Sequence, residues 1–380
     1  MIRLNSPVSE KITSLAALGL LAGMALSWPL WNTDARECFP VVALWGGPNW
    51  KSPAVLLYTG IWPALAVSVI AAVTLLFPGK RGLTVSLAAV LLFLGLSDIN
   101  RLQPWVWFYL LLFIAGFIGK KESVKVESMR WVLAGVYFWG GFNKLTPYFV
   151  EDNFPWFCEA FPIIKNLGQY PLAGYVVAAM EMSLAAGILL PKWRPYFRRV
   201  IPVFHATIVI FLWKLDWNMV VIPWNVAMAG MAWLLCSAQA SPKELVDTAV
   251  LPRKSLLMPG IAGWLACFSP LLHLFGLWPH PLSWQMYTNT QPEATFVSEY
   301  GQTCNRELDE MWNALAFDNK TKLSIDDWAT QELHVPVFAD IWVFRRIKTS
   351  LYGCPLNGDL YVLTVDQWDK SKEKLEKISK

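Results

Sequence analysis

Residues 137–150 read YFWGGFNKLTPYFV, and this stretch decides what kind of protein the chain forms. Lys144 stands near the end of a long apolar segment, next to several aromatic residues and the glycine pair Gly140 and Gly141. A lysine at bilayer depth costs several kcal/mol unless it is paired or hydrated, so its presence there marks a candidate functional site. The stretch therefore predicts a membrane helix that carries a functional group.

The composition of the whole chain supports a membrane protein. Of the 380 residues, 55% are hydrophobic and only 16% are charged, against about 45–50% and about 25% in ordinary soluble domains. The mean hydropathy is +0.38, and 22 tryptophans supply rings that favour membrane–water interfaces. These values exclude a soluble enzyme, a disordered chain and a nucleic-acid-binding protein. The chain is predicted to be an all-α polytopic membrane protein.

Nine apolar segments are candidates for membrane spans, since a spanning helix needs about 20 mostly apolar residues. Pro104 separates the third from the fourth segment and predicts a turn there, because proline disrupts a continuous helix. The segments cover 12–31, 54–77, 83–98, 104–119, 131–149, 173–191, 200–215, 222–238 and 256–278. They form a predicted membrane domain over residues 1–280, followed by a smaller domain over 281–380.

Lysines and arginines are unevenly divided between alternate connections. One set of connections holds fifteen, namely Arg3, Lys11, Lys80, Arg81, Lys120, Lys121, Lys125, Arg130, Lys192, Arg194, Arg198, Arg199, Lys243, Arg253 and Lys254. The other set holds Arg36, Lys51, Arg101 and Lys165, with Lys214 near a boundary. Positive residues favour the cytoplasmic side. We therefore expect a multi-pass protein of the plasma or inner membrane with a cytoplasmic N-terminus and an extracytoplasmic C-terminal domain.

Four cysteines fall on the predicted outer side, where an oxidising compartment permits disulfides. The simplest pairing is Cys304 with Cys354 and Cys38 with Cys158, although the sequence leaves other pairings open.

The outer domain is expected to be a small α+β unit. Its predicted helices are Arg306–Phe317 and Val337–Lys348, and its predicted strands are Phe296–Tyr300 and Leu360–Val365. The final run KSKEKLEKISK (370–380) is interpreted as a solvated helix end.

Three ionisable residues on consecutive predicted spans are candidate catalytic groups: Lys144, Glu181 and His205. Sequential helices with short connections usually pack together, so the three side chains can meet. A desolvated lysine is a candidate base, and the carboxylate or the imidazole would tune or relay its proton. The alternatives remain open: Lys144 can extend to the interface, Glu181 can hydrogen-bond between helices, and His205 can be a satisfied core residue.

Further polar and aromatic residues near the outer ends of spans are candidates for substrate binding: Asp98, Arg101, Trp105, Asn143, Asp216 and Asn218. The last two lie in LWKLDWNMVVIPWN (212–225), a polar interruption that either lines a cavity or forms an interfacial turn. Asp98 and Arg101 either shape the mouth of the site or pair with each other. No metal site is predicted, because only His273 and His280 of the four histidines are near neighbours.

The stretch YFWGGFNKLTPYFV, together with SDINRLQPWVWFY (97–109), AAMEMSLAAGILL (178–190) and VFHATIVIF (203–211), resembles the horizontally transferred transmembrane domain of the vitamin K-dependent γ-carboxylase family. The resemblance covers roughly residues 10–280 as short motifs in the same order. It implies that Lys144 acts as a base on a reduced quinone. The Pro-Trp-Val-Trp sequence at 104–107 and the shorter tail differ from the carboxylases.

The functional expectation is thus a carboxylase-like membrane domain whose outward-facing site acts on a quinone or another lipid, or on an exported peptide. The alternative is a non-catalytic membrane subunit that anchors or matures an exported partner protein. Membrane lipid, an exported protein or peptide, or another membrane subunit are the expected partners.

Overall fold

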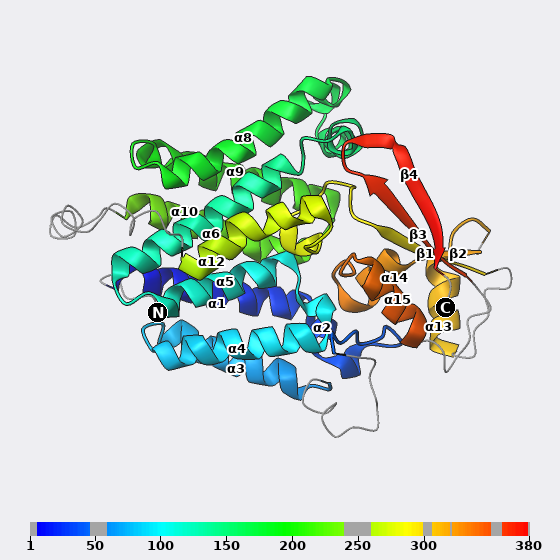
Figure 1. Cartoon of the computed structure of the whole chain (residues 1–380), viewed down its shortest axis with the longest axis horizontal. Helices are drawn as coiled ribbons and strands as arrows, with labels where there is room; N and C mark the ends of the chain where they lie inside the picture. The colour runs from blue at the N-terminus through cyan, green and yellow to red at the C-terminus, as the bar shows by residue number, and fades with distance from the viewer. Residues whose placement is uncertain are drawn as a thin grey trace.

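The computed structural model describes residues 6–45, 59–238, 260–298, 306–319, 321–350 and 359–378. The described chain is mostly helical and carries a small sheet near its C-terminus. In Figure 1 the long helices form a bundle, and the sheet with its short helices lies at one end of that bundle.

Each of the nine expected segments contains a helix. These helices are α1 (Val8–Leu26), α3 (Trp62–Leu76), α4 (Arg81–Ser97), α5 (Pro104–Ile118), α6 (Glu122–Phe142), α8 (Pro171–Leu189), α9 (Arg194–Leu215), α10 (Ile222–Ser237) and α12 (Gly260–Phe268), which continues as the 3-10 turn η8 (Ser269–Phe275). Short elements connect them: α2 (Trp28–Trp31), η1 (Thr33–Ala35), η3 (Ile99–Arg101), η4 (Phe149–Asn153), α7 (Phe154–Glu159), η5 (Lys165–Gln169), η6 (Met219–Val221) and η9 (Pro281–Ser283).

Four helical segments of the described chain are long and apolar enough to cross a membrane: α1, α8, α9 and the continuous run Met219–Ser237. The helices α3, α4, α5 and α12 with η8 are apolar but shorter than these. Helix α6 is 21 residues long, but its first half carries four charged residues. Length and composition therefore support membrane association, while the expectation of nine crossings goes beyond them.

Helix α5 lies at the centre of the bundle. Every side chain from Trp105 to Phe113 is buried, as expected for a helix that is apolar on all faces. Its neighbours include α1, α4, α6 and α12. Gly23 of α1 permits the close approach of α5, because a Cβ there would lie 2.8 Å from the ring of Trp105.

Helix α9, in contrast, is almost entirely on the outside. Only Ile201, His205 and Leu212 of its 22 residues are buried. Its outer face is apolar, with Val203 66% and Trp213 68% exposed. A continuous apolar face of this kind needs an apolar environment, which a bilayer supplies.

The C-terminal unit contains four antiparallel strands in the order β2-β1-β3-β4: β1 (Glu293–Val297), β2 (Lys322–Ser324), β3 (Asp359–Asp366) and β4 (Asp369–Ile378). Three helices accompany the sheet: α13 (Arg306–Leu315), α14 (Ile325–Leu333) and α15 (Ile341–Ser350). Their buried side chains, including Trp312, Trp328 and Phe344, join the same apolar core as the helix bundle. The residues 284–292 that precede β1 run along the bundle, and the sheet itself begins at Glu293.

The expected helix end at the C-terminus is wrong. Residues Asp369–Ile378 form the edge strand β4, which pairs with β3 in the register Val362↔Glu376. The strand is stabilised by its backbone pairing, and its alternating lysines and glutamates stay in solvent. Charged side chains are common on such edges because they discourage further pairing. The other expected elements are present, with boundaries that differ by a few residues. Residues 299–300 of the strand expected at Phe296–Tyr300 lie outside the described residues.

A cluster of donors around Glu332 joins the two parts of the chain. Its Oε2 accepts the backbone N–H groups of Glu37 (3.0 Å), Cys38 (2.9 Å) and Phe39 (2.7 Å). Its Oε1 accepts the indole N–H of Trp328 at 2.6 Å. Because Glu332 belongs to α14 and the three N–H groups belong to the loop after η1, this carboxylate fixes the C-terminal unit to the bundle. This unit is termed the outer domain for its place at one end of the bundle (Figure 1).

Two further contacts extend this junction. The Phe338 N–H donates to Oδ1 of Asn100 at 3.0 Å, and the Gln103 amide donates to the Pro336 carbonyl at 2.9 Å.

The expected Cys38–Cys158 disulfide is wrong, because both cysteines are free. The Cys38 thiol donates to Oε1 of Glu332 at 2.9 Å, and burial together with this carboxylate raises the pKa of Cys38. Cys158 is buried with Phe149, Val150 and Phe154. Each sulfur thus has its own environment. Cys304 and Cys354 lie outside the described residues.

We expect Glu332→Gln to lower the stability of the protein markedly. Each hydrogen bond to a charged group contributes about 1.5–3 kcal/mol, and the amide presents only one acceptor to several donors. Thermal unfolding of the detergent-solubilised protein measures the loss. Glu310→Gln, which alters an exposed pair with Arg306, is the matched control. Equal melting temperatures for the two variants would contradict the proposed role of Glu332.

Candidate functional site

One face of α6 carries the polar groups of the site. Tyr137 and Lys144 are seven residues apart, two helical turns, so both point to the same side of the helix axis, with Gly140 and Gly141 between them. Lys144 follows directly after the end of α6, in the turn that leads to η4. This face meets α8, and next to it α9.

Lys144 and Glu181 form a buried ion pair between α6 and α8. Nζ of Lys144 lies 2.7 Å from Oε2 of Glu181, and it also donates to the Gly140 carbonyl at 3.0 Å. Each residue is only 7% exposed. The lysine therefore does not extend into solvent, and the two residues that the sequence assigned to neighbouring spans are in direct contact.

The glycine pair allows α6 and α8 to approach this closely. A Cβ at Gly140 would lie 2.7 Å from Oε1 of Glu181, and one at Gly141 would lie 2.5 Å from the Ala178 carbonyl oxygen. Any larger residue at these positions would push the helices apart and separate the charges. The glycines are thus a steric requirement of the ion pair.

His205 belongs to a second polar group on the same face of α6. Its Nε2 lies 2.7 Å from the Tyr137 hydroxyl, and its Nδ1 lies 2.9 Å from Oδ1 of Asn225. Asn225 in turn donates to the Val221 carbonyl at 2.9 Å, which orients its oxygen toward the ring. Because an amide oxygen only accepts, Nδ1 carries a proton, whereas Nε2 and the Tyr137 hydroxyl share the second hydrogen bond. Both ring nitrogens of His205 are therefore partnered.

The three expected catalytic residues thus separate into a charged pair and a histidine cluster. In an apolar environment the two charges of a Lys–Glu pair are penalised by desolvation, and their direct contact offsets that cost. Amines and carboxyl groups are both among the side chains that serve as general acids and bases.

The tip of the β3–β4 hairpin packs over the outer end of α6. The Gln367 amide donates to Oδ1 of Asn143 at 3.4 Å, and Trp368 makes an edge-to-face contact with Phe142. Asn143 also donates to the Ser283 carbonyl at 2.8 Å. In Figure 1 the hairpin reaches from the sheet toward the bundle. Asn143 therefore joins the turn carrying Lys144 to the outer domain.

Asp98 and Arg101 hold the outer loops together. The Asp98 carboxylate forms a 2.6 Å ion pair with Arg36, and both side chains are buried. Arg101 donates to the carbonyls of Leu30 and Trp31. Asp98 and Arg101 are both fully buried. Their contacts therefore stabilise the connection between α2 and η3. Asp216 occupies the left-handed turn that ends α9.

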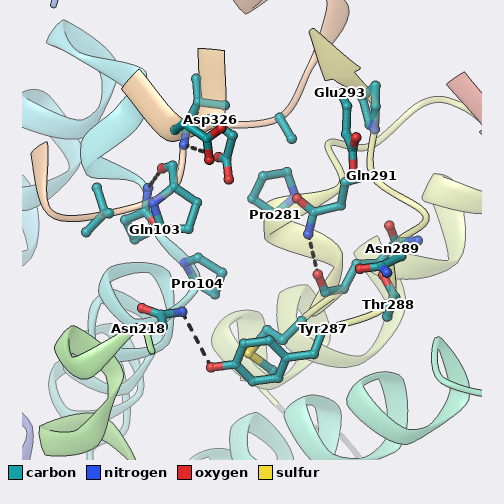
Figure 2. A pocket seen from close by; sticks show the side chains of 18 of the residues that line it. Gln103, Pro104, Asn218, Pro281, Tyr287, Thr288, Asn289, Gln291, Glu293 and Asp326 are labelled. Carbon is teal, nitrogen blue, oxygen red and sulfur yellow. Dashed lines mark hydrogen bonds between the residues drawn. The ribbon is translucent and has the colours of Figure 1, made fainter. Parts of the chain in front are cut away.

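Trp105 and Asn218 lie in a different place, a cavity of about 500 Å³ between the bundle and the outer domain. Figure 2 shows Asn218 beside Tyr287 at one end of this cavity, and Asp326 and Glu293 at the other end. The polar interruption at 212–225 does line it, through Trp217, Asn218, Val221 and Trp224. Lys144, Glu181 and His205 are not among its lining residues.

The chain matches no protein-family model, no curated protein and no solved structure. The resemblance to the carboxylase membrane domain accordingly stays a prediction.

Several residues of these sites had no clear signal in the sequence. Tyr137 is one aromatic residue among many, although its seven-residue spacing from Lys144 places it on the same helix face. Glu332, Asp326 and Glu293 stand among many other charged residues of the tail. Only the tertiary structure distinguishes them.

We expect Lys144→Met to destabilise the protein by about 3–5 kcal/mol, because it leaves the Glu181 carboxylate buried without its partner. Removing both charges in Lys144→Met/Glu181→Leu should restore most of the loss. Unfolding of the three proteins in one detergent measures this coupling. Additive losses in the double variant would show that the two side chains do not depend on each other.

We expect Gly141→Ala to destabilise the protein by about 1–3 kcal/mol through overpacking against α8. Gly82→Ala is the matched control, because a Cβ there meets nothing within 4 Å. The same unfolding measurement compares the two. A Gly141→Ala protein as stable as the control would contradict the close approach of α6 and α8.

Proposed function

We propose that this chain is a nine-span membrane protein that performs proton-transfer chemistry on a lipid-like substrate, a quinone, at the Lys144–Glu181 pair. Its N-terminus is cytoplasmic and residues 281–380 are extracytoplasmic. The observation that carries the proposal is the buried 2.7 Å contact between an amine just after the end of α6 and a carboxylate on the apolar helix α8.

The surroundings of the pair support a substrate from the membrane. Glu181 stands on α8 next to Met180, whose side chain is 47% exposed on the outer face of that helix. The pair thus lies one helix away from the lipid-facing surface. A hydrophobic molecule reaches such a site laterally without passing through water.

The chemistry follows from the pair. A phenolic hydroxyl of the substrate gives its proton to the Lys144–Glu181 pair, which then carries one proton more, and the Lys144 ammonium stabilises the resulting phenolate. The pair returns this proton at product release. Gly140 contributes the carbonyl that orients Nζ. Tyr137 and His205 supply a hydrogen-bonded group about two turns closer to the start of α6.

Mass spectrometry of lipids that co-purify with the protein tests the proposal. We expect the wild type and the surface variant Lys165→Ala to retain a quinone, and Lys144→Met/Glu181→Leu to lose it. The double variant is used because it should remain folded, which its unfolding curve checks. A quinone retained equally by the double variant, or bulk phospholipid alone in the wild type, would contradict a quinone site at this pair.

The sidedness has its own test. Asn319 is exposed and begins the sequence Asn-Lys-Thr at 319–321, an acceptor for N-glycosylation. We expect the chain translated into endoplasmic-reticulum microsomes to gain one glycan at Asn319, because the proposed orientation places this domain in the lumen. Asn319→Gln should abolish the mobility shift. Protease digestion of the outer domain from the cytoplasmic side would contradict the orientation.

A further inference from the structure

Three arginines meet at the end of the bundle that lies away from the sheet, where α8 and α10 end and α9 begins (Figure 1). Arg130 comes from α6, whereas Arg194 and Arg198 come from the first turns of α9. Oε2 of Glu127 lies 3.0 Å from Nη1 of Arg130 and 3.9 Å from Nη2 of Arg194. Two guanidinium groups thus share one oxygen, and among the described residues no other carboxylate is in contact with these arginines.

Arg194 and Arg198 belong to the buried face of α9. They are four residues apart, and His205 lies seven residues further on the same side of the helix. His205 is buried, and the Arg194 side chain is only 13% exposed. The neighbouring Arg199 is exposed, as is usual for arginines and lysines near the end of a span. The first two arginines therefore face the adjoining helices.

Part of this positive charge serves the fold. Arg130 donates to carbonyls at the end of α10, and Arg194 donates to carbonyls at the end of α8. Each of these helix ends carries about half a negative charge, and the start of α9 carries about half a positive charge. When Glu127 is included, about one and a half positive charges remain without compensation from the described residues.

Arg198 is the arginine that makes no polar contact within the fold. Its guanidinium carbon lies 5.9 Å from the centre of the Trp233 ring, a cation–π contact that orients the group. Its Nε is buried and does not reach a ligand, but the two terminal nitrogens keep accessible surface and have no acceptor among the described residues. Nη1 of Arg194 is in the same situation. Terminal guanidinium nitrogens match the spacing of two phosphate oxygens.

The surface around the arginines resembles a membrane–water interface. Trp193, Tyr196 and Trp233 are 41%, 72% and 48% exposed. Exposed tryptophan and tyrosine rings gather at the level of the lipid headgroups, where the phosphates also lie. A headgroup at this level is therefore within reach of the accessible arginine nitrogens.

We propose that this site binds the phosphate of an anionic phospholipid, with one free oxygen at the terminal nitrogens of Arg198 and the other at Nη1 of Arg194. The uncompensated positive charge suits the single negative charge of a phosphodiester and disfavours a headgroup that also carries an ammonium. The acyl chains lie along the apolar outer surface of α9. Arg130 precedes Lys144 by fourteen residues, about 20 Å along α6, so either proposal can fail without the other.

The lipid preference is tested by native mass spectrometry of the full-length protein in detergent. Phosphatidylglycerol and phosphatidylcholine with the same acyl chains are titrated, and the affinity for the first bound lipid is compared. We expect phosphatidylglycerol to bind at least about fivefold more tightly, because each cation near an anionic lipid contributes about this factor. Equal affinities for the two lipids would overturn the proposal.

A pair of neighbouring variants assigns the binding to this site. We expect Arg198→Gln to weaken phosphatidylglycerol binding by about fivefold. Because Arg198 donates no hydrogen bond to the described residues, this variant should keep the wild-type unfolding curve. Arg199→Gln removes the same charge from the exposed next position and should leave the affinity unchanged. Wild-type affinity in Arg198→Gln, or an equal loss in both variants, would contradict the assignment.

A measurement on the wild type does not depend on the variants. Phenylglyoxal modifies accessible arginines, and peptide mass spectrometry reads the extent at each position. We expect modification of Arg198 to be lower in phosphatidylglycerol nanodiscs than in phosphatidylcholine nanodiscs, by a larger factor than modification of Arg199. The same factor at both arginines would rule out a specific site.

A soluble phosphate ester is the other source of the same chemistry. In phosphatidylcholine nanodiscs, sn-glycerol 3-phosphate offers a phosphate without acyl chains. We expect it to leave the phenylglyoxal modification of Arg198 unchanged, because the acyl chains contribute to binding in the proposed site. Protection of Arg198 by glycerol 3-phosphate equal to that by phosphatidylglycerol would assign the site to a soluble phosphate and overturn the lipid proposal.

Discussion

The Glu332 carboxylate is the contact on which the relation between bundle and outer domain depends. Three consecutive backbone N–H groups, a thiol and an indole donate to its two oxygens. A buried carboxylate with so many donors tolerates the loss of water that an isolated charge does not. The loop at 37–39 is fixed by the same contact. The cavity and the position of the hairpin over α6 both follow from this junction.

The need of a buried charge for close partners also explains the charged residues inside the bundle. Asp98 is neutralised by Arg36 and Glu181 by Lys144, at distances of 2.6 and 2.7 Å. The first pair ties connections together, whereas the second lies between two apolar helices that glycines bring close. Both partners are buried in each of these two ion pairs, so burial by itself does not indicate function. The distinguishing feature of the second pair is that Glu181 lies in the middle of α8, a helix long and apolar enough to cross a membrane.

The sequence predicted the helical segments well, because apolar runs and proline breaks are local signals. Helices α4 and α5 are separate as expected, and Pro104 is the first residue of α5. It also identified Lys144 and Glu181, since charges in apolar runs stand out. It failed where long-range pairing decides. The run at 370–380 has a helix-like composition, yet its described residues 370–378 form a strand that pairs with β3. A Cys38–Cys158 disulfide is the simplest pairing of cysteines on one predicted side of the membrane. The tertiary structure instead places Cys38 beside Glu332 and Cys158 among Phe149, Val150 and Phe154.

The cavity has walls from two parts of the chain, the helix bundle on one side and the segment with β1 and α14 on the other. A molecule that fills it touches both parts, so its binding free energy is added to the free energy that holds them together. By thermodynamic linkage, occupancy disfavours opening of the junction by the same factor by which opening lowers the affinity of the cavity. Occupancy of the cavity is in this way coupled to the C-terminal unit, whose β3–β4 hairpin contacts Asn143, next to Lys144.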